Sequence, residues 1–325
     1  MNLDFDKILS KYAELAVKIG VNIQPNQYLY IAASIEVAPF VQIITKIAYE
    51  VGAKNVFVDY TDDQVTRARY ELAPDDSFDF FPPWKIQERE WLAEQGAAFI
   101  SIVSQSPDLL KGIDSKRIAS FQKAAGIALT KYRQYVQSDK ISWTVIAAPS
   151  KDWAAKVFPT ISADKQVEAL WAAIFKATRA DLEAPVEAWT KHNETLHEKV
   201  QYLNDKRYTK LHYTAPGTDL TIELPTGHLW CGASSTNEKG DAFMANMPTE
   251  EVFTVPHKEG VNGYVSSTKP LSYGGNIIDK FKVTFENGRI VAVEAEQGEG
   301  YHPSGNARLV HKSFKDIKSG YKCYR

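Results

Sequence analysis

Two adjacent glutamates, Glu250 and Glu251, have the setting in this sequence that most favours metal or acid–base chemistry. They follow a Pro-Thr pair and precede an apolar run, 252–255, that predicts a strand. Neighbouring side chains of a strand point to opposite faces, so one glutamate can face inward while the other faces solvent. An inward carboxylate needs a cation or strong hydrogen-bond donors to offset its desolvation. The pattern alone equally describes two surface acids at the start of a strand, which is the more common case.

Motifs for other kinds of chemistry are absent from the sequence. It contains no glycine-rich phosphate loop, no H-E-x-x-H zinc motif and no G-x-S-x-G hydrolase motif. His192 and His197 lie five residues apart on a polar helix face, which is a poor geometry for a shared metal ion. We therefore interpret them as solvated helix histidines. The tryptophans are scattered through apolar stripes and indicate core positions rather than a stacking surface for nucleic acid.

The charge balance and the hydropathy of the sequence limit the classes of binding partner and the cellular locations that we expect. The 325 residues include 38 basic and 40 acidic side chains, a balance that gives no overall attraction to nucleic acid or to a membrane surface. No apolar run approaches the ~20 residues that span a bilayer. The N-terminus is acidic and lacks the basic and then apolar pattern of an export signal. We therefore expect a cytoplasmic protein with no nucleic-acid partner and no membrane partner.

Helical and strand patterns alternate through the first part of the chain. Strands separated by helices imply parallel pairing through right-handed crossovers. Short, nearly continuous apolar strands suit a sheet that is covered on both faces. We predict an α/β first domain over 1–190, with a largely parallel sheet flanked by helices. The expected strands are 28–32, 55–60, 99–103 and 143–147, and the expected helices are 8–19, 37–51, 116–135, 163–179 and 185–204.

The hydrophobic period changes to alternation after about residue 208. Residues 219–224 alternate polar and apolar, as a half-buried strand does. Asn287 and Gly288 separate two further apolar runs and predict a tight hairpin, because an Asn-Gly pair readily adopts the positive φ angles of such a turn. We therefore predict a second, mostly antiparallel β domain over 191–300 that is incomplete.

Five segments together resemble one enzyme family. The Pro-Thr-Glu-Glu-Val-Phe element at 248–253 is the most specific of them. The other four occur in order along the chain, at 14–22, 215–220, 260–263 and 267–275. On these motifs, residues 1 to about 298 resemble the metallo-aminopeptidases of the thermophilic metalloprotease type, the family of aminopeptidase T, aminopeptidase S and PepS.

The resemblance implies hydrolysis that removes the N-terminal residue from peptide substrates. It implies two divalent cations per subunit, with zinc, cobalt, manganese or magnesium as candidates. Paired cations lower the pKa of a shared water and polarise the scissile carbonyl, and carboxylates and imidazoles hold them. The resemblance places one metal ligand on Glu250, although a one-residue slip would move it to Glu251. It also implies a homodimer, and it leaves the catalytic residues unassigned.

The sequence departs from the family pattern after residue 298. The family's remaining ligands lie in a Gly-Glu-Val-Ala stretch, after Glu-Asn-Ala-Ser, and in a His-x-Asp pair before Phe-Met, and none of these motifs occurs here. Residues 301–325 instead hold six basic side chains and one acid, an unrelated basic tail that a frameshift near codon 299 would produce. We therefore expect a C-terminally truncated member that binds paired metals poorly and has little or no peptidase activity.

Two other hypotheses fit the same sequence. The chain can be a non-catalytic peptide-binding or regulatory remnant of the family. It can also be an enzyme whose incomplete second domain exposes apolar faces and an unpaired strand edge around 281–285.

Overall fold

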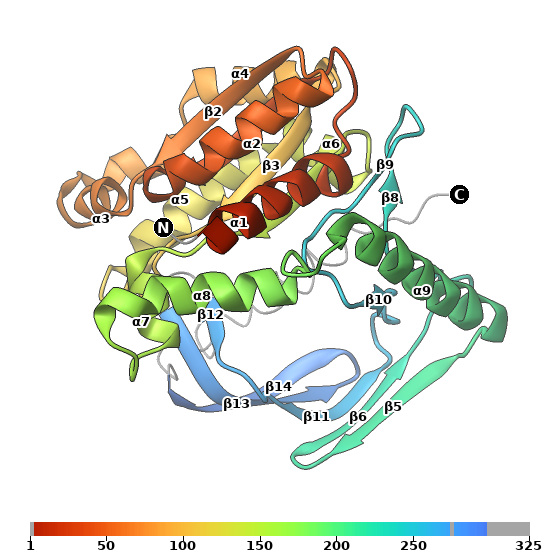
Figure 1. Cartoon of the computed structure of the whole chain (residues 1–325). Coiled ribbons are helices and arrows are strands. Elements are labelled where there is room, and N and C mark those ends of the chain that lie inside the picture. The colour runs from red at the N-terminus through yellow and green to blue at the C-terminus, as the bar shows by residue number, and fades with distance from the viewer. Residues whose placement is uncertain (1–2, 274–275, 298–325) are drawn as a thin grey trace. The chain divides into compact units, whose positions relative to one another are not determined.

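The chain folds into two compact units in the computed structural model, which describes residues 3–273 and 276–297 (Figure 1). Among the described residues, the first unit comprises 3–195 and 233–250, and the second comprises 196–232, 251–273 and 276–297. The domain limits expected after residues 190 and 300 stay a prediction. The tail at 301–325 lies outside the described residues.

A four-stranded parallel sheet forms the centre of the first unit. Its order is β2-β1-β3-β4, and Tyr30 of β1 lies opposite Phe57 of β2 and Phe99 of β3. The chain steps outward from β1 to β2 and then returns to the other side of β1, which places connecting helices on both faces. The strands are β1 (Tyr28–Ser34), β2 (Asn55–Thr61), β3 (Ala98–Val103) and β4 (Trp143–Ala147).

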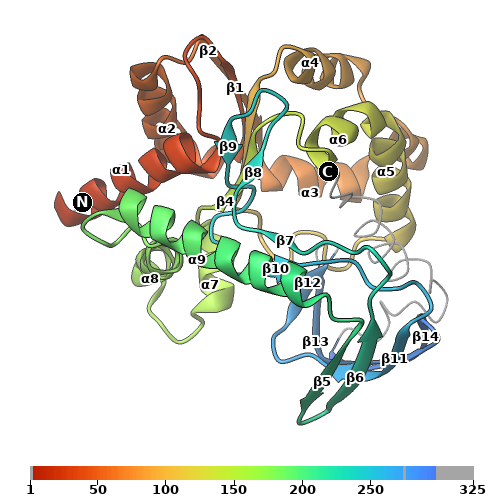
Figure 2. The same cartoon turned by 90° about the vertical axis from the view of Figure 1, so that its right-hand side faces the viewer.

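Alternate side chains of β1 belong to two separate cores. Leu29 and Ile31 belong to the larger core, and Tyr30 belongs to the smaller one. Figure 2 shows helices on either side of the sheet. The larger core is lined by α1 (Leu3–Leu15), the π-helical turn η1 (Ala16–Gly20), α2 (Ala38–Val51), α7 (Lys151–Val157) and α8 (Ala163–Ala177). The smaller core is lined by α4 (Pro83–Glu94) and α6 (Thr130–Gln137).

Local signals set the ends of several helices. Gly52 ends α2 at a φ of 108°, and its N–H donates to the carbonyls of Ala48 and Tyr49. The single helix expected at 116–135 is two helices, with Leu129 at the break. The sequence did not predict α3 or α4. The remaining elements of this unit are η2 (Ile35–Val37), α3 (Asp63–Leu72), η3 (Asp75–Asp79), α5 (Ser115–Ala128) and the first half of α9 (Pro185–Lys206).

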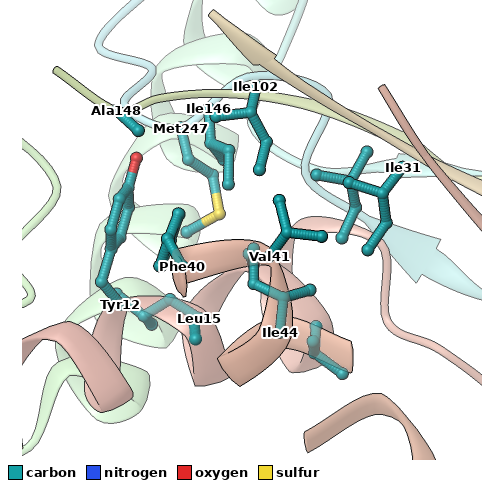
Figure 3. Close-up of a cluster of buried hydrophobic side chains, with 14 of the residues drawn as sticks. Tyr12, Leu15, Ile31, Phe40, Val41, Ile44, Ile102, Ile146, Ala148 and Met247 are labelled. Carbon is teal, nitrogen blue, oxygen red and sulfur yellow. The ribbon is translucent and has the colours of Figure 1, made fainter. Parts of the chain in front are cut away.

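Residues 233–250 return to the first unit after the chain has already entered the second. This segment contains β8 (Ser235–Thr236) and β9 (Ala242–Phe243). It hydrogen-bonds along β4, where the Val145 N–H donates to the Ala245 carbonyl at 2.9 Å. Met247 is buried in the larger core, where Figure 3 shows its side chain beside Phe40. The segment is therefore an integral part of the first unit.

The second unit is an antiparallel sheet of order β12-β13-β11-β6-β5, with β14 also paired to β13. Leu220, Val283 and Phe285 form the centre of its core. Its main strands are β5 (Lys210–Ala215), β6 (Thr218–Glu223), β11 (Val261–Ser266), β12 (Leu271–Tyr273), β13 (Asn276–Glu286) and β14 (Arg289–Gln297). Two shorter strands, β7 (Cys231–Gly232) and β10 (Val252–Phe253), pair with each other.

The predicted fold class is confirmed: a parallel sheet flanked by helices is followed by antiparallel β structure. The expectation of an unpaired edge around 281–285 is wrong, because β13 pairs with β11 and with β14, which buries Val283 and Phe285. Within 3–273 and 276–297, none of the helices combines the length and the apolar character that crossing a membrane requires.

Candidate functional site

The two candidate glutamates lie where the chain leaves the first unit. Glu250 is the last residue of that unit, and Glu251 is the first residue of the next segment of the second unit. Both are exposed, so neither carboxylate faces inward, and the alternative of two surface acids describes them. The strand after them, β10, has only two residues, which is too short to hold one of the two side chains against a buried face.

Arg179, in the turn that follows α8, pairs with Glu250. The Nη1 atom of Arg179 lies 2.8 Å from Oε1 of Glu250. The Arg179 side chain is 24% exposed and that of Glu250 is 59% exposed, so the pair lies at the surface with its cationic partner more enclosed. The hydrogen bond from Arg179 lowers the pKa of Glu250 below its ordinary value. Burial opposes this shift, and the charges of His192 and Arg179 add to it.

His192 of α9 completes this cluster of three ionisable side chains. Its Nε2 atom lies 2.7 Å from the Thr249 carbonyl and 3.4 Å from Oε2 of Glu250, and its Nδ1 atom lies 3.3 Å from Nη2 of Arg179. The Nε2 atom of the ring therefore faces a carbonyl oxygen, and the Nδ1 atom faces a guanidinium. The interpretation of His192 as a solvated histidine is wrong, since its side chain is 13% exposed.

A buried tryptophan supports the arginine and the histidine. The Arg179 guanidinium lies 5.4 Å from the ring centroid of Trp189, and the imidazole of His192 meets the same indole edge-on at 5.6 Å. Trp189 is fully buried, and its Nε1–H donates to the Thr178 carbonyl at 2.7 Å. The corner between α8 and α9 therefore holds the two side chains that contact Glu250.

The donor set of this cluster does not fit a pair of divalent cations. Paired cations need several carboxylate and imidazole ligands. Glu250 and His192 are the ligand-type residues here, and both are bonded to a guanidinium. In the part of the chain that the structure describes, no group of three or more His, Cys, Asp or Glu side chains is arranged to hold a metal ion. The assignment of Glu250 as a metal ligand stays a prediction.

The sequence did not identify Arg179 or His192 as neighbours of Glu250. Arg179 lies 71 positions before Glu250 and carries no motif. Its positive φ of 61° closes the turn after α8 and is not visible in the sequence. The spacing of three residues between Trp189 and His192 indicates that the two side chains are neighbours on one helix face. It does not indicate that His192 lies near Glu250.

Comparison with known proteins assigns the chain to a family. Residues 5–302 match the family model described as "Thermophilic metalloprotease (M29)". The chain belongs to the thermophilic metalloprotease family, M29. The match confirms the family predicted from the sequence, and with it the prediction of an enzyme by family. Membership in M29 also implies divalent metal ions.

M29 relatives cover most of the chain. Aminopeptidase AmpS of Bacillus subtilis (strain 168) is 61% identical over 295 residues, which are 91% of this chain and 72% of that protein. Aminopeptidase T of Thermus thermophilus is 39% identical over 295 residues, with the same two coverages. The structure of wild-type AmpT from Thermus thermophilus matches with a TM-score of 0.85 and 37% identity, covering 91% of this chain and 73% of that one. M29 thus accounts for both the fold and the sequence motifs.

Proposed function

We propose that this protein is an aminopeptidase that uses two divalent cations per subunit to release N-terminal residues from peptide substrates. The observation that carries the proposal is 61% identity, over 91% of the chain, to a protein named aminopeptidase AmpS. Zinc, cobalt, manganese and magnesium are the candidate ions, and Glu250 is the ligand that this chain contributes. The exposed carboxylate of Glu250 supports that role, because a cation can reach it from solvent.

We also propose that the polypeptide of 325 residues has little peptidase activity by itself. Its described residues hold no three-ligand cluster, and its sequence lacks the family motifs that carry the other ligands. A single carboxylate binds a hard cation weakly in competition with water.

The test is to measure metal content and turnover on the same sample. The purified 325-residue polypeptide is loaded with zinc, cobalt or manganese, dialysed, and measured by plasma mass spectrometry. The same sample is assayed on leucyl and arginyl chromogenic substrates, with Glu250→Gln as the control. We expect fewer than two ions per chain and turnover close to that of the control. Two ions per chain, or robust turnover that Glu250→Gln abolishes, would refute the impairment and leave the aminopeptidase proposal standing.

A non-catalytic peptide-binding or regulatory remnant of the family is the second candidate. It is favoured by the intact fold of the first unit together with the incomplete ligand set. Calorimetric titration of a short peptide in the presence of a chelator separates the two, since binding that needs no metal supports the remnant. The proposed homodimer and the cytoplasmic location accompany both candidates, and light scattering of the purified chain tests the dimer.

A further inference from the structure

We propose that the free edge of β2 is a self-association surface, at which β2 pairs antiparallel with β2 of a second copy of this chain about a two-fold axis. The two four-stranded parallel sheets then join into one continuous sheet. The inference deepens the proposed function, on which it rests for the homodimer, by naming the strand at which the two copies meet.

The outer side of β2 has backbone groups available for pairing. β2 is the last strand at one end of the parallel sheet, and among the described strands only β1 pairs with it. Val56 directs its N–H away from β1, since that group donates to the hydroxyl of Tyr49 on α2 at 3.1 Å. Alternate residues of a strand direct their N–H and C=O groups to the same side, so Val58 and Tyr60 present theirs at the edge. The side chains of Val58 and Tyr60 are 37% and 38% exposed.

The usual protections of an edge strand are missing from β2. Edge strands are commonly guarded by lysine, by proline or by a β-bulge. β2 contains neither lysine nor proline, and its seven residues pair with β1 in one unbroken register. The charge of Asp59 is neutralised beside α4, because its carboxylate oxygens lie 2.5 Å from Nζ of Lys85 and 3.7 Å from Nη2 of Arg89. The strand therefore carries no feature that opposes pairing with another strand.

The sequence around β2 is complementary to itself in one register. A two-fold axis at Val58, the midpoint of β2, lets two copies overlap along the whole strand, and positions equally far from Val58 face each other. Val56 then lies opposite Tyr60 of the other copy, which makes an apolar pair. Lys54 lies opposite Asp62, which places opposite charges at both ends of the interface. This charge complementarity favours a second copy over an unrelated extended peptide.

Exposed aromatic side chains border the edge of β2 on both faces of the sheet. Tyr49 is exposed on the face that α2 covers, where it contacts the Val56 N–H. Trp91 of α4 is exposed on the opposite face, and its ring lies 6.4 Å from that of Phe57 in β2. Aromatic residues are enriched where proteins meet. A second copy seated on the edge would cover both rings, which adds apolar contact to the backbone hydrogen bonds.

The test is sedimentation velocity of the purified, full 325-residue chain over a range of concentrations. We expect an equilibrium between monomer and dimer. Val58→Lys sets two like charges against each other at the axis, and it should weaken dimerisation at least about tenfold. Val157→Lys is the matched control, because Val157 is an exposed valine (45%) on α7, which follows β4 at the other end of the sheet. It should leave the dimer unchanged.

A charge reversal and a cross-link test the register. Lys54→Glu sets two acids against each other at each end and should weaken the dimer roughly three- to tenfold, and adding Asp62→Lys should restore it. Asp62 caps α3, so circular dichroism confirms that each variant is folded. Val58→Cys leaves this cap intact and brings two thiols together at the axis. Oxidised glutathione should convert them to an intermolecular disulfide, whereas Val157→Cys should stay uncrosslinked.

The inference is overturned by a chain that stays monomeric at every concentration, or by a dimer that Val58→Lys weakens no more than Val157→Lys does. Assemblies that grow beyond the dimer also overturn it, because a two-fold axis closes after two copies. Failure of the proposed function is a separate result, read from turnover of the leucyl and arginyl substrates. An active monomer counts against only the inference. A dimer that responds to Val58→Lys but never hydrolyses peptides counts against only the function.

Discussion

At the scale of single residues, Asp63 is a buried carboxylate outside the candidate site. Asp63 begins α3 and is 8% exposed. Its Oδ2 atom accepts a hydrogen bond from the Ser106 N–H at 2.8 Å, whereas Oδ1 has no partner within the described residues. Burial raises the pKa of Asp63 above its ordinary value. The Ser106 bond opposes that shift, and the negative charges of Asp152 and Asp62 add to it.

Substitution of Asp63 by Asn should stabilise the protein at neutral and alkaline pH. A carboxyl whose pKa is higher in the folded state than in the unfolded state stabilises the fold most when it is protonated in both states, at a pH below its unfolded-state pKa. That stabilisation is lost as the pH rises through the folded-state pKa. The amide keeps an acceptor for Ser106 and removes the buried charge. We expect the variant to melt roughly 1–3 °C above the unmodified protein at pH 8. The difference should shrink toward pH 3.5, below the ordinary pKa of about 3.9.

Thermal melts at several pH values provide the measurement. Asp76→Asn, at an exposed position, is the control and should show no such dependence. A stability gain that grows toward acid pH would contradict the expected sign.

At the scale of elements, the hairpin between β13 and β14 shows what sequence can predict. Asn287 and Gly288 have φ angles of 49° and 72°, as the Asn-Gly pattern indicates. The Asn-Gly pattern does not reveal a second constraint on residue 288, which comes from a part of the chain distant in sequence. A Cβ on Gly288 would collide with the Lys258 carbonyl. Gly227 also has a positive φ, 79°, but no heavy atom lies within 4 Å of the place a Cβ would take.

These two glycines form a matched pair of substitutions in the second unit. Gly227→Ala should cost about 1–2 kcal/mol, the cost of placing a non-glycine residue in the left-handed region. Gly288→Ala should cost more, because the Lys258 backbone must also move. The measurement is the free energy of unfolding in urea. Equal losses in the two variants would show that the Lys258 contact has no energetic consequence.

Elements whose signal is local were predictable, and those that depend on tertiary contacts were not. Strand 143–147 was predicted with its observed bounds, because an apolar run between turns specifies it. The helices α3 and α4 were missed, since many of their side chains are charged and few are buried. The approach of Arg179 and His192 to Glu250 could not be predicted, because it depends on a turn after α8 and on the return of 233–250 to the first unit.

At the scale of the whole molecule, each compact unit is assembled from two separate stretches of chain. The return segment contributes Met244 and Met247 to a core that otherwise comes from the first 195 residues. The contact also sets the position of Glu250, which lies three residues after Met247. Packing in the larger core and the placement of the candidate ligand are therefore coupled through one short segment.

Substitution of Met247 by Ala should therefore destabilise the first unit strongly. Removal of a fully buried methionine side chain costs about 2–5 kcal/mol. Val65→Ala removes an exposed side chain in the same unit, one that is 70% exposed, and should change stability by less than about 0.5 kcal/mol. Melting followed by circular dichroism compares the two. Similar melting temperatures for both variants would show that residues 233–250 are not part of the core.

The return of 233–250 has a consequence for dissecting or recombining this protein. Helix α9 continues across the limit at 195/196, and the chain crosses again at 232/233 and at 250/251. A gene fragment that stops at residue 195 would encode the whole parallel sheet and leave an unfilled hole where two methionines belong. Exchange of the second unit with that of a relative would need three crossover points instead of one, so recombination at a single breakpoint should yield hybrids with damaged cores.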